Sequence, residues 1–187
     1  MRNLIYAINF TIDGCCDHTQ VGPPPDDLFD YYIRLVQDID AFVYGRKTYQ
    51  LMVPYWPDIA KNPSGQTASD VEFAKAFVAV KKMVVFSKTL EKSDEKNTEI
   101  VRTNLKEEIL KFKQEEGKSI LTGGINIPSQ LIQLGLVDEY RFVILPVFGG
   151  EGRRLLEGIK LQEKSPLRLV ETKTFKSGAI ALRYLKQ

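Results

Sequence analysis

Cysteine and histidine are scarce in this sequence of 187 residues, which contains only Cys15, Cys16 and His18. A zinc site takes three or four protein ligands, usually Cys or His, so we expect no metal centre. Side chains of adjacent residues diverge, which makes Cys15 and Cys16 poor disulfide partners. So few cysteines are typical of a reducing compartment. The sequence therefore favours a cytoplasmic protein without disulfides or a bound metal.

A long hydrophobic segment is also absent. The longest apolar stretch, residues 142–148, is far shorter than the roughly 20 residues that span a membrane. Asn9 and Asp13 interrupt the apolar N-terminal stretch before it reaches the length of a signal-peptide core. Positive and negative side chains nearly balance, with 26 Lys and Arg against 24 Asp and Glu, so no global field attracts nucleic acid. We expect neither a membrane span nor a nucleic-acid partner.

The hydrophobic patterns predict a single α/β domain over residues 1–187. Apolar runs typical of strands alternate with helical periodicity, and a turn at residues 176–178 joins the last two runs into a hairpin. These features predict a mixed, mainly parallel sheet with helices on both faces and a C-terminal antiparallel hairpin. The expected strands cover residues 4–11, 41–44, 83–86, 100–102, 119–122, 139–145, 167–175 and 179–185, and the expected helices cover 28–39, 46–53, 69–78, 105–116 and 126–134.

Capping residues and prolines set the expected helix ends. We expect Asp26 or Asp27 to cap the first helix, Asn104 the fourth and Asn126 the fifth. We expect Pro54 to end the helix that begins at Arg46, because proline lacks the N–H that an interior helix position needs.

Two strand-turn-helix junctions, residues 43–48 and 121–126, contain glycine just before a helix begins. Glycine lets a phosphate approach the backbone, and the free N–H groups of the helix face that phosphate. The alternative is that these glycines only satisfy turn geometry. Arg46 and Lys47 favour the phosphate interpretation, because the helix dipole disfavours cations in a first turn unless an anion is bound.

Ser87, Lys88 and Thr89 follow the strand at residues 83–86, where an NAD-selective Rossmann domain usually places an acidic residue. The chain also lacks the G-x-G-x-x-G motif, so a standard Rossmann fold is excluded. The alternative interpretation of these three residues is a solvated turn.

The order of the motifs resembles the dihydrofolate reductase superfamily. The motifs are Thr11-Ile12-Asp13-Gly14, Gly45-Arg46-Lys47-Thr48-Tyr49, Phe86-Ser87-Lys88-Thr89, Thr122-Gly123-Gly124 and Pro146-Val147-Phe148-Gly149-Gly150-Glu151-Gly152. The Asp-Gly turn and the late glycine-rich loop are most similar to the reductase domain of the riboflavin-biosynthesis deaminase-reductase, and the resemblance covers nearly the whole chain.

The resemblance implies an NADPH site and a neighbouring substrate site. Backbone groups of Ala7 and Ile8 would contact the nicotinamide amide. The adenosine ribose and its 2′-phosphate would lie near Ser87 and Lys88. The other implied cofactor contacts are Gly45, Arg46, Lys47 and Thr48 for phosphates, and Thr122, Gly123, Gly124, Ile125 and Asn126 around the pyrophosphate. The residues implied at the substrate mouth are Gly149, Gly150, Glu151 and Gly152.

Two aspartates are candidates for the catalytic acid. Dihydrofolate reductases place an acid at the start of the first helix, where this chain has Asp27, although an aspartate there also serves as a cap. Asp13 is the second candidate, although aspartate is common in turns. The tryptophan that usually precedes the acid is replaced by three prolines at residues 23–25, which argues against folate as the substrate. His18 is interpreted as an exposed bystander.

The resemblance implies a reductase that transfers a hydride from NADPH to a small pyrimidine- or pterin-like substrate. The nearest family member in pattern is 5-amino-6-(5-phosphoribosylamino)uracil reductase. Two alternatives stay open: a dihydrofolate reductase, and an NADP-binding module without catalytic activity. We also expect a homodimer, formed through an exposed sheet edge or the late glycine-rich loop.

Overall fold

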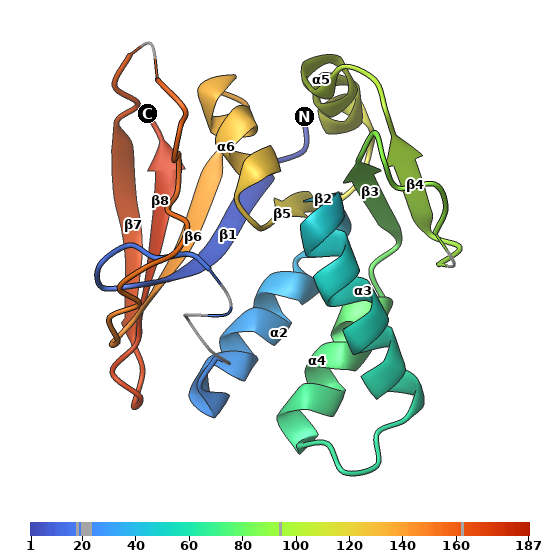
Figure 1. The fold of residues 1–187 in the computed structure, drawn as a ribbon, viewed down its shortest axis with the longest axis vertical. Coiled ribbons are helices and arrows are strands. Elements are labelled where there is room, and N and C mark those ends of the chain that lie inside the picture. Colours follow the sequence, from blue (N-terminus) through green and yellow to red (C-terminus); the bar gives the residue numbers. More distant parts are fainter. Residues whose placement is uncertain (18, 20–23, 94, 162) are drawn as a thin grey trace.

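The computed structural model describes residues 1–17, 19, 24–93, 95–161 and 163–187, and an eight-stranded sheet forms its centre (Figure 1). The strand order is β4-β3-β2-β5-β1-β6-β8-β7. Strands β1 to β6 are parallel, whereas β8 is antiparallel to both β6 and β7. This confirms the predicted sheet with its C-terminal hairpin. The strands are β1 (Leu4–Thr11), β2 (Ile39–Gly45), β3 (Lys82–Phe86), β4 (Thr98–Val101), β5 (Ser119–Thr122), β6 (Glu139–Leu145), β7 (Leu167–Thr174) and β8 (Ile180–Lys186).

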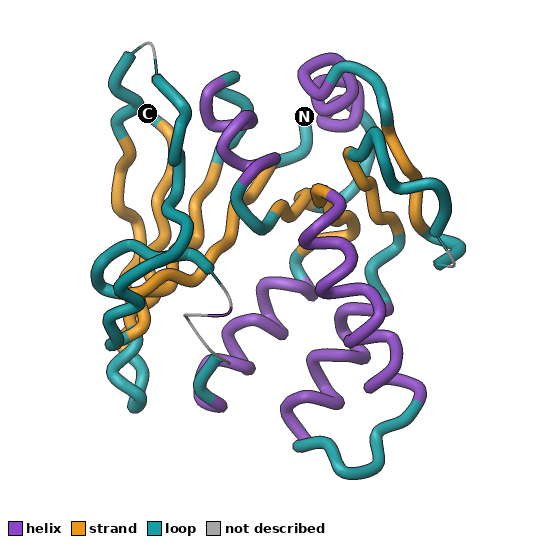
Figure 2. Tube along the Cα trace, viewed as in Figure 1, coloured by secondary structure: helices purple, strands orange, loops and turns teal. Residues whose placement is uncertain are grey.

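Helices cover both faces of the sheet. Helices α2, α3 and α4 bury their apolar side chains on one face, and α5 and α6 pack on the other. In Figure 2, α5 and α6 lie above the central strands and α2 to α4 lie below them. The helices are η1 (Asp26–Leu28, a 3-10 turn), α2 (Phe29–Gln37), α3 (Arg46–Lys61), α4 (Ala68–Val78), α5 (Leu105–Gln114) and α6 (Asn126–Gln133). Among the described residues, no helix combines the length and apolar character needed to cross a membrane.

Several helix boundaries differ from the prediction, chiefly the ends of α2 and α3; α5 also ends two residues early, at Gln114. Helix α3 continues through Pro54 and Pro57 to Lys61. Pro54 is exposed, so the carbonyl that its missing N–H leaves free can bind water, while buried side chains such as Tyr49, Val53 and Ile59 hold the helix against the core. Helix α2 ends at Gln37, and Ile39 begins the buried strand β2 although it fits the helical period.

The predicted caps are only partly confirmed. Asn104 caps α5 by accepting bonds from the N–H groups of Lys106 and Glu107. Asp26 and Asp27 do not cap: both lie inside η1, which has no side-chain cap bond. Asn126 is also inside its helix, because Ile125 occupies the cap position of α6. His18 and Pro23 lie outside the described residues.

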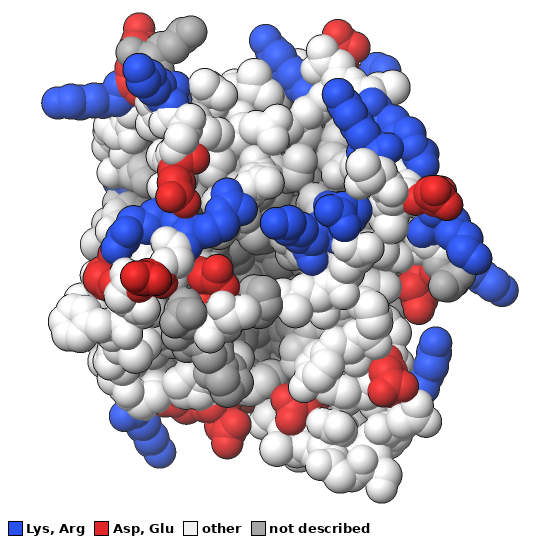
Figure 3. Space-filling view, in the orientation of Figure 1, with Lys and Arg blue, Asp and Glu red and all other residues white. Residues whose placement is uncertain are grey.

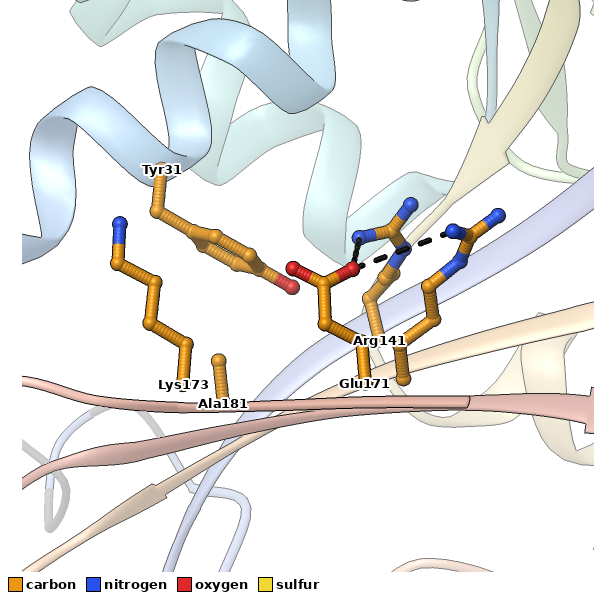
Figure 4. A pocket seen from close by; sticks show the side chains of 6 residues that line it. Tyr31, Arg141, Glu171, Lys173 and Ala181 are labelled. Atoms are coloured by element: carbon orange, nitrogen blue, oxygen red, sulfur yellow. Dashed lines mark ion pairs between the residues drawn. The ribbon is translucent and has the colours of Figure 1, made fainter. Parts of the chain in front are cut away.

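The antiparallel end of the sheet contains a buried carboxylate, Glu139, on β6. It accepts bonds from Arg141 Nε at 2.5 Å and from Arg183 Nε and Nη2 at 3.0 and 3.1 Å. Glu171 on β7 lies 3.9 Å from each arginine (Figure 4). Burial raises the pKa of Glu139, but the bonds and charges of the two arginines outweigh burial and leave that pKa below its usual value. Glu139 is therefore the ionised centre of this network.

We predict that Glu139→Gln destabilises the protein by about 3 kcal/mol near neutral pH, because both arginines lose a buried partner. A carboxyl whose pKa is lower in the folded state stabilises the protein at pH values above its unfolded-state pKa, and this contribution is lost as the pH falls. The difference in unfolding free energy between wild type and Glu139→Gln should therefore shrink as the pH falls below 4.5. Urea denaturation from pH 7 to pH 3 measures both effects. Glu171→Gln is the matched control, since Glu171 is half-exposed and should contribute less than about 1 kcal/mol. Equal losses of unfolding free energy in Glu139→Gln and Glu171→Gln would contradict this account of Glu139.

Candidate active site

A crevice forms at the carboxyl edge of the sheet, where the neighbouring strands β2 and β5 send their helices to opposite faces. Helix α3 follows β2 and packs on one face, while α6 follows β5 and packs on the other. In open α/β sheets, ligands bind in the crevice created by such a divergence. Both predicted phosphate-binding junctions lie at this point, so the fold brings them together.

The starts of α3 and α6 are in direct contact. A Cβ atom on Gly124 would lie 2.2 Å from Thr48 Oγ1, and a Cβ on Gly45 would lie 3.0 Å from Ile127 Cγ1. Gly124 also has a φ of +82°, which L side chains rarely adopt. Glycine is required here by both space and backbone conformation, so turn geometry alone does not account for Gly124.

Strand β1 forms the floor of the crevice beside these glycines. A Cβ on Gly123 would lie 3.6 Å from the Ala7 carbonyl oxygen, and the Tyr6 hydroxyl donates to the Gly124 carbonyl at 2.9 Å. The structure thus places Ala7, a predicted nicotinamide contact, next to the predicted pyrophosphate loop. Ile8 follows on the same strand with its side chain among the residues packed against the α6 side of the sheet.

Cations gather at the mouth of the crevice. Arg46 and Lys47 are exposed in the first turn of α3, and that turn contains no acidic residue. Among the described residues, Arg46 Nη1 donates a hydrogen bond to Gln50 Oε1 at 3.0 Å. Figure 3 shows a hollow near the centre of this face with Lys and Arg side chains on both sides of it. This charge distribution suits an anionic ligand.

The segment after β3 forms a turn. The Ser87 hydroxyl oxygen accepts bonds from the N–H groups of Thr89 and Leu90, so the turn that was the alternative interpretation is present. Lys88 is exposed, and Arg102, which the sequence analysis missed, donates to the Leu90 carbonyl at 2.7 Å. Two cations therefore flank this turn, and its contact with a nucleotide stays a prediction.

Two other predicted cofactor residues have structural partners. The buried Thr122 hydroxyl donates to the Val43 carbonyl at 2.8 Å and ties β5 to β2. Asn126 Oδ1 accepts a bond from Arg153 Nη2 at 2.7 Å. Arg153 thereby joins the start of α6 to the end of the glycine-rich loop. No local sequence motif marks this contact, because its two members are 27 positions apart.

Asp13 holds the glycine-rich loop in place. One carboxylate oxygen accepts bonds from Thr11 Oγ1 at 2.5 Å and from the Gly149 N–H at 2.9 Å, and the other accepts from the Gly150 N–H at 2.9 Å. The bond from Thr11, followed by that from Gly149, lowers the pKa of Asp13 to about 2. These contacts favour a permanently ionised, structural carboxylate, and an acid role for Asp13 stays a prediction.

The two cysteines pack against the same loop. A Cβ on Gly149 would lie 2.8 Å from Cys15 Cβ, and Cys15 Sγ donates to the Glu151 carbonyl at 3.3 Å. Both thiols are free, and burial raises the pKa of Cys16 to about 11. The loops at residues 13–16 and 149–154 therefore form one unit bordering the crevice.

Asp27 lies between η1 and the hairpin that joins β7 to β8. Its Oδ2 accepts a bond from the Ser177 N–H at 2.8 Å, and this bond lowers the pKa of Asp27. Its Oδ1 is buried and has no hydrogen-bond partner among the described residues. The described contacts thus hold Asp27 as an ionised carboxylate against the β7–β8 hairpin, and its place in a substrate cleft stays a prediction.

Asn9 and Tyr32 are additional polar candidates that the sequence analysis missed. The Tyr32 hydroxyl donates to Asn9 Oδ1 at 2.9 Å, which ties α2 to β1 two residues beyond Ala7. No local sequence motif marks this pair, because its two members are 23 positions apart and meet only when α2 folds onto the sheet.

The chain belongs to the RibD C-terminal domain family, whose model matches residues 4–181. YyaP of Bacillus subtilis (strain 168), an uncharacterized protein, is 37% identical over 189 residues, which cover 98% of this chain and 94% of YyaP. The resemblance to the reductase domain of the riboflavin-biosynthesis enzyme is confirmed.

Solved structures show the same fold. The deaminase/5-amino-6-(5-phosphoribosylamino)uracil reductase of Thermotoga maritima matches with a TM-score of 0.68 and 15% identity, over 100% of this chain and 57% of that one. Dihydrofolate reductase from Enterococcus faecalis, complexed with NADP(H), matches with a TM-score of 0.63 and 15% identity, over 99% and 96% of the two chains. The fold is therefore dihydrofolate-reductase-like, and its family and fold neighbours are reductases.

We predict that Gly124→Ala destabilises the protein more than Gly65→Ala. The two glycines have matching φ angles of +82° and +81°, so both variants carry similar backbone strain of about 1 to 2 kcal/mol. A Cβ at residue 65 meets no atom within 4 Å, whereas at residue 124 it collides with Thr48. Chemical denaturation measures the difference, and Thr48→Ala should recover part of it when combined with Gly124→Ala. Equal losses of unfolding free energy in Gly65→Ala and Gly124→Ala would contradict tight packing between α3 and α6.

Proposed function

We propose that this protein is an NADPH-dependent reductase that binds its cofactor in the crevice between α3 and α6. The observation that carries the proposal is the convergence of two glycine-containing helix starts beside β1, with exposed cations at the mouth. Helix N-termini and cations both favour phosphate groups, and membership of the RibD C-terminal domain family supports a reductase. The proposed compartment is the cytoplasm.

The described residues fit a phosphate-rich dinucleotide. Gly45 and Gly124 let the two helix starts pack closely against Ile127 and Thr48, so that N–H groups of both starts could face the same phosphates. Thr48 would add a hydroxyl there, and Arg46 and Lys47 would neutralise the phosphate charge. The remaining proposed contacts are backbone groups of Ala7 and Ile8 at the nicotinamide amide, Thr122, Gly123, Ile125 and Asn126 beside the pyrophosphate, and Ser87 with Lys88 at the adenosine ribose and 2′-phosphate. When bound, the cofactor supplies a hydride.

The proposed substrate is a small pyrimidine of the 5-amino-6-(5-phosphoribosylamino)uracil type. Asp27 would orient it, because a carboxylate accepts hydrogen bonds from ring N–H groups and Oδ1 of Asp27 has no hydrogen-bond partner among the described residues. That oxygen is buried, so the side chain or the neighbouring hairpin would move when the substrate binds. Asp13 would act by holding the glycine-rich loop, residues 149–152, at the substrate mouth. Dihydrofolate is the second candidate substrate, supported by the fold shared with dihydrofolate reductase over nearly the whole chain.

We predict that Arg46→Ala weakens NADPH binding by about 10- to 100-fold, the contribution of one charge-assisted hydrogen bond. Its thermal midpoint without ligand should stay close to that of wild type, because Arg46 is exposed. Fluorescence titration measures the NADPH affinity, and thermal melts measure the midpoint. In the same titration, wild type should bind NADPH more tightly than NADH. Lys61→Ala, at the far end of α3, is the control and should change neither quantity. An Arg46 variant with unchanged NADPH affinity would remove Arg46 from the cofactor site.

We predict that the purified protein oxidises NADPH in the presence of the phosphoribosylaminouracil, and that Asp27→Asn lowers this rate by about 100-fold, since a hydrogen bond to a charged group contributes up to about 3 kcal/mol. Affinity for NADPH should not change, because Asp27 binds the substrate in this proposal. Absorbance of NADPH follows the reaction, with dihydrofolate assayed in parallel.

Asp26→Asn is the matched control, because Asp26 is the exposed neighbour in the same 3-10 turn and should retain full activity. Reduction of dihydrofolate alone would replace the proposed substrate with the second candidate. Tight NADPH binding without reduction of either compound would argue for an NADP-binding module.

A further inference from the structure

A row of side chains crosses the α2 side of the sheet at one level of the strands. Ala7 of β1 pairs with Arg141 of β6, Arg141 pairs with Arg183 of β8, and Arg183 pairs with Glu171 of β7. Ala7 packs against the α2 side of the core, and the three charged residues lie beside Tyr31 of α2. Neighbouring strands are about 4.8 Å apart, so both arginines begin within about 10 Å of Ala7. Two cations thus adjoin the position proposed for the nicotinamide.

The two arginines are not fully paired by the buried Glu139. Glu139 accepts hydrogen bonds from Nε of both arginines and from Nη2 of Arg183. Nη1 of Arg141 and Nη1 of Arg183 each lie 3.9 Å from Glu171 Oε2, which is too long for a hydrogen bond. Among the described residues, neither Nη1 atom donates a hydrogen bond. Each guanidinium therefore keeps a donor available for another acceptor.

Tyr31 adds a third donor to the same space. Its hydroxyl oxygen is buried and has no hydrogen-bond partner among the described residues. Burial raises the pKa of Tyr31, so the hydroxyl keeps its proton. In Figure 4 this hydroxyl points toward the carboxylate of Glu171. Buried polar groups normally have a partner, so an acceptor from outside the described chain would satisfy the hydroxyl and both arginines.

Glu171 is a loosely held neighbour of these three donors. It lies on β7, an edge strand of the sheet, where the pairing with β8 is irregular between Leu169 and Glu171. A bulge of this kind redirects side chains. The Glu171 side chain is 52% exposed and forms no hydrogen bond with the described residues, whereas the side chain of Glu139 is 4% exposed. Glu171 can therefore turn into solvent without breaking a hydrogen bond, which opens the space between the three donors.

The three donors favour an anionic oxygen ligand. A guanidinium fork matches two oxygens of a carboxylate or a phosphate, and hydrogen bonds to ionised groups are about twice as strong as neutral ones. With Glu171 in solvent, the positive charges of Arg141 and Arg183 exceed the negative charge of Glu139. Lys173 also lines the space. A neutral ligand would leave this positive charge without a counter-ion, so the space selects an anionic group.

We propose that Arg141, Arg183 and Tyr31 form a subsite for an anionic group of the substrate, a phosphate or a carboxylate, which displaces Glu171. The inference rests on the proposed function, because that function places the reacting ring beside Ala7. It adds a requirement on the substrate, whose anionic group lies within about 10 Å, or two strand spacings, of that ring. Both candidate substrates carry such a group, since the uracil compound has a ribosyl phosphate and dihydrofolate has a glutamate tail.

Binding of substrate fragments tests the subsite without catalysis. Ribose 5-phosphate and para-aminobenzoylglutamate carry the anionic groups of the two candidate substrates but no reducible ring. Calorimetric titration of the full chain, with NADPH present to occupy the phosphate-binding crevice, measures their dissociation constants. We expect Glu171→Gln to tighten binding of the preferred fragment by about 10-fold, because the competing carboxylate is gone. Glu99→Gln is the matched control: Glu99 is a half-exposed glutamate on the opposite edge strand, 3.2 Å from Lys82, and should leave binding unchanged.

Two further variants remove donors from the subsite. Tyr31→Phe and Arg183→Gln should each weaken fragment binding by about 10-fold or more. Tyr31→Phe separates binding from folding, because its hydroxyl has no partner among the described residues, so the thermal midpoint without ligand should not fall. Tyr55→Phe is the control, since Tyr55 on α3 is exposed and outside the subsite. Circular dichroism shows whether Arg183→Gln is folded; if it is not, Tyr31→Phe and Glu171→Gln decide the result.

Tighter binding in Glu171→Gln together with weaker binding in Tyr31→Phe supports the subsite, and the fragment that binds identifies the group as phosphate or carboxylate. Binding that is unchanged in both variants but lost in Arg46→Ala would overturn the proposal, by placing the anion at the start of α3. Absence of binding of both fragments to wild type and to Glu171→Gln would also overturn it. The predicted pattern in a protein that oxidises NADPH with neither substrate would retain the subsite and refute the reductase assignment.

Discussion

The contact between the starts of α3 and α6 is the constraint on which the candidate site depends. Strands β2 and β5 are neighbours, so helices that leave them for opposite faces must begin within a few ångströms of each other. A Cβ atom on Gly124 would lie 2.2 Å from Thr48 Oγ1, so a side chain at residue 124 would displace Thr48. The close contact brings the N-terminal turns of α3 and α6 together, and helix N-termini favour phosphate groups.

A second constraint comes from the loops that border the crevice. Asp13 accepts N–H groups from Gly149 and Gly150, and Arg153 reaches from the end of the same segment to Asn126 at the start of α6. The loop after β6 is thereby tied both to the end of β1 and to the proposed cofactor site. A carboxylate with a pKa of about 2 stays ionised through the physiological range, so protonation does not release this tie.

Local patterns predicted much of the fold and less of the site. Every strand boundary lies within two residues of the prediction, because buried strands produce apolar runs that end at turn residues. The continuation of α3 through Pro54 was not predictable from local rules, since tertiary packing of Tyr49 and Val53 offsets the lost hydrogen bond. The Tyr32–Asn9 bond and the contact of Asp27 with Ser177 join segments distant in sequence, and neither leaves a local signal. Sequence motifs identified glycines and cations near the crevice, but not which side chains already have structural partners.

The two halves of the sheet meet different requirements. In the parallel half, helices cover both faces, and the strand ends remain open for a ligand. In the antiparallel half, α2 packs over a face that contains paired charges, and the buried Glu139 accepts hydrogen bonds from both Arg141 and Arg183. An apolar residue in place of Arg141 or Arg183 would leave Glu139 without one of these partners. This face therefore depends on paired charges, whereas the faces of the parallel half depend on apolar packing against helices.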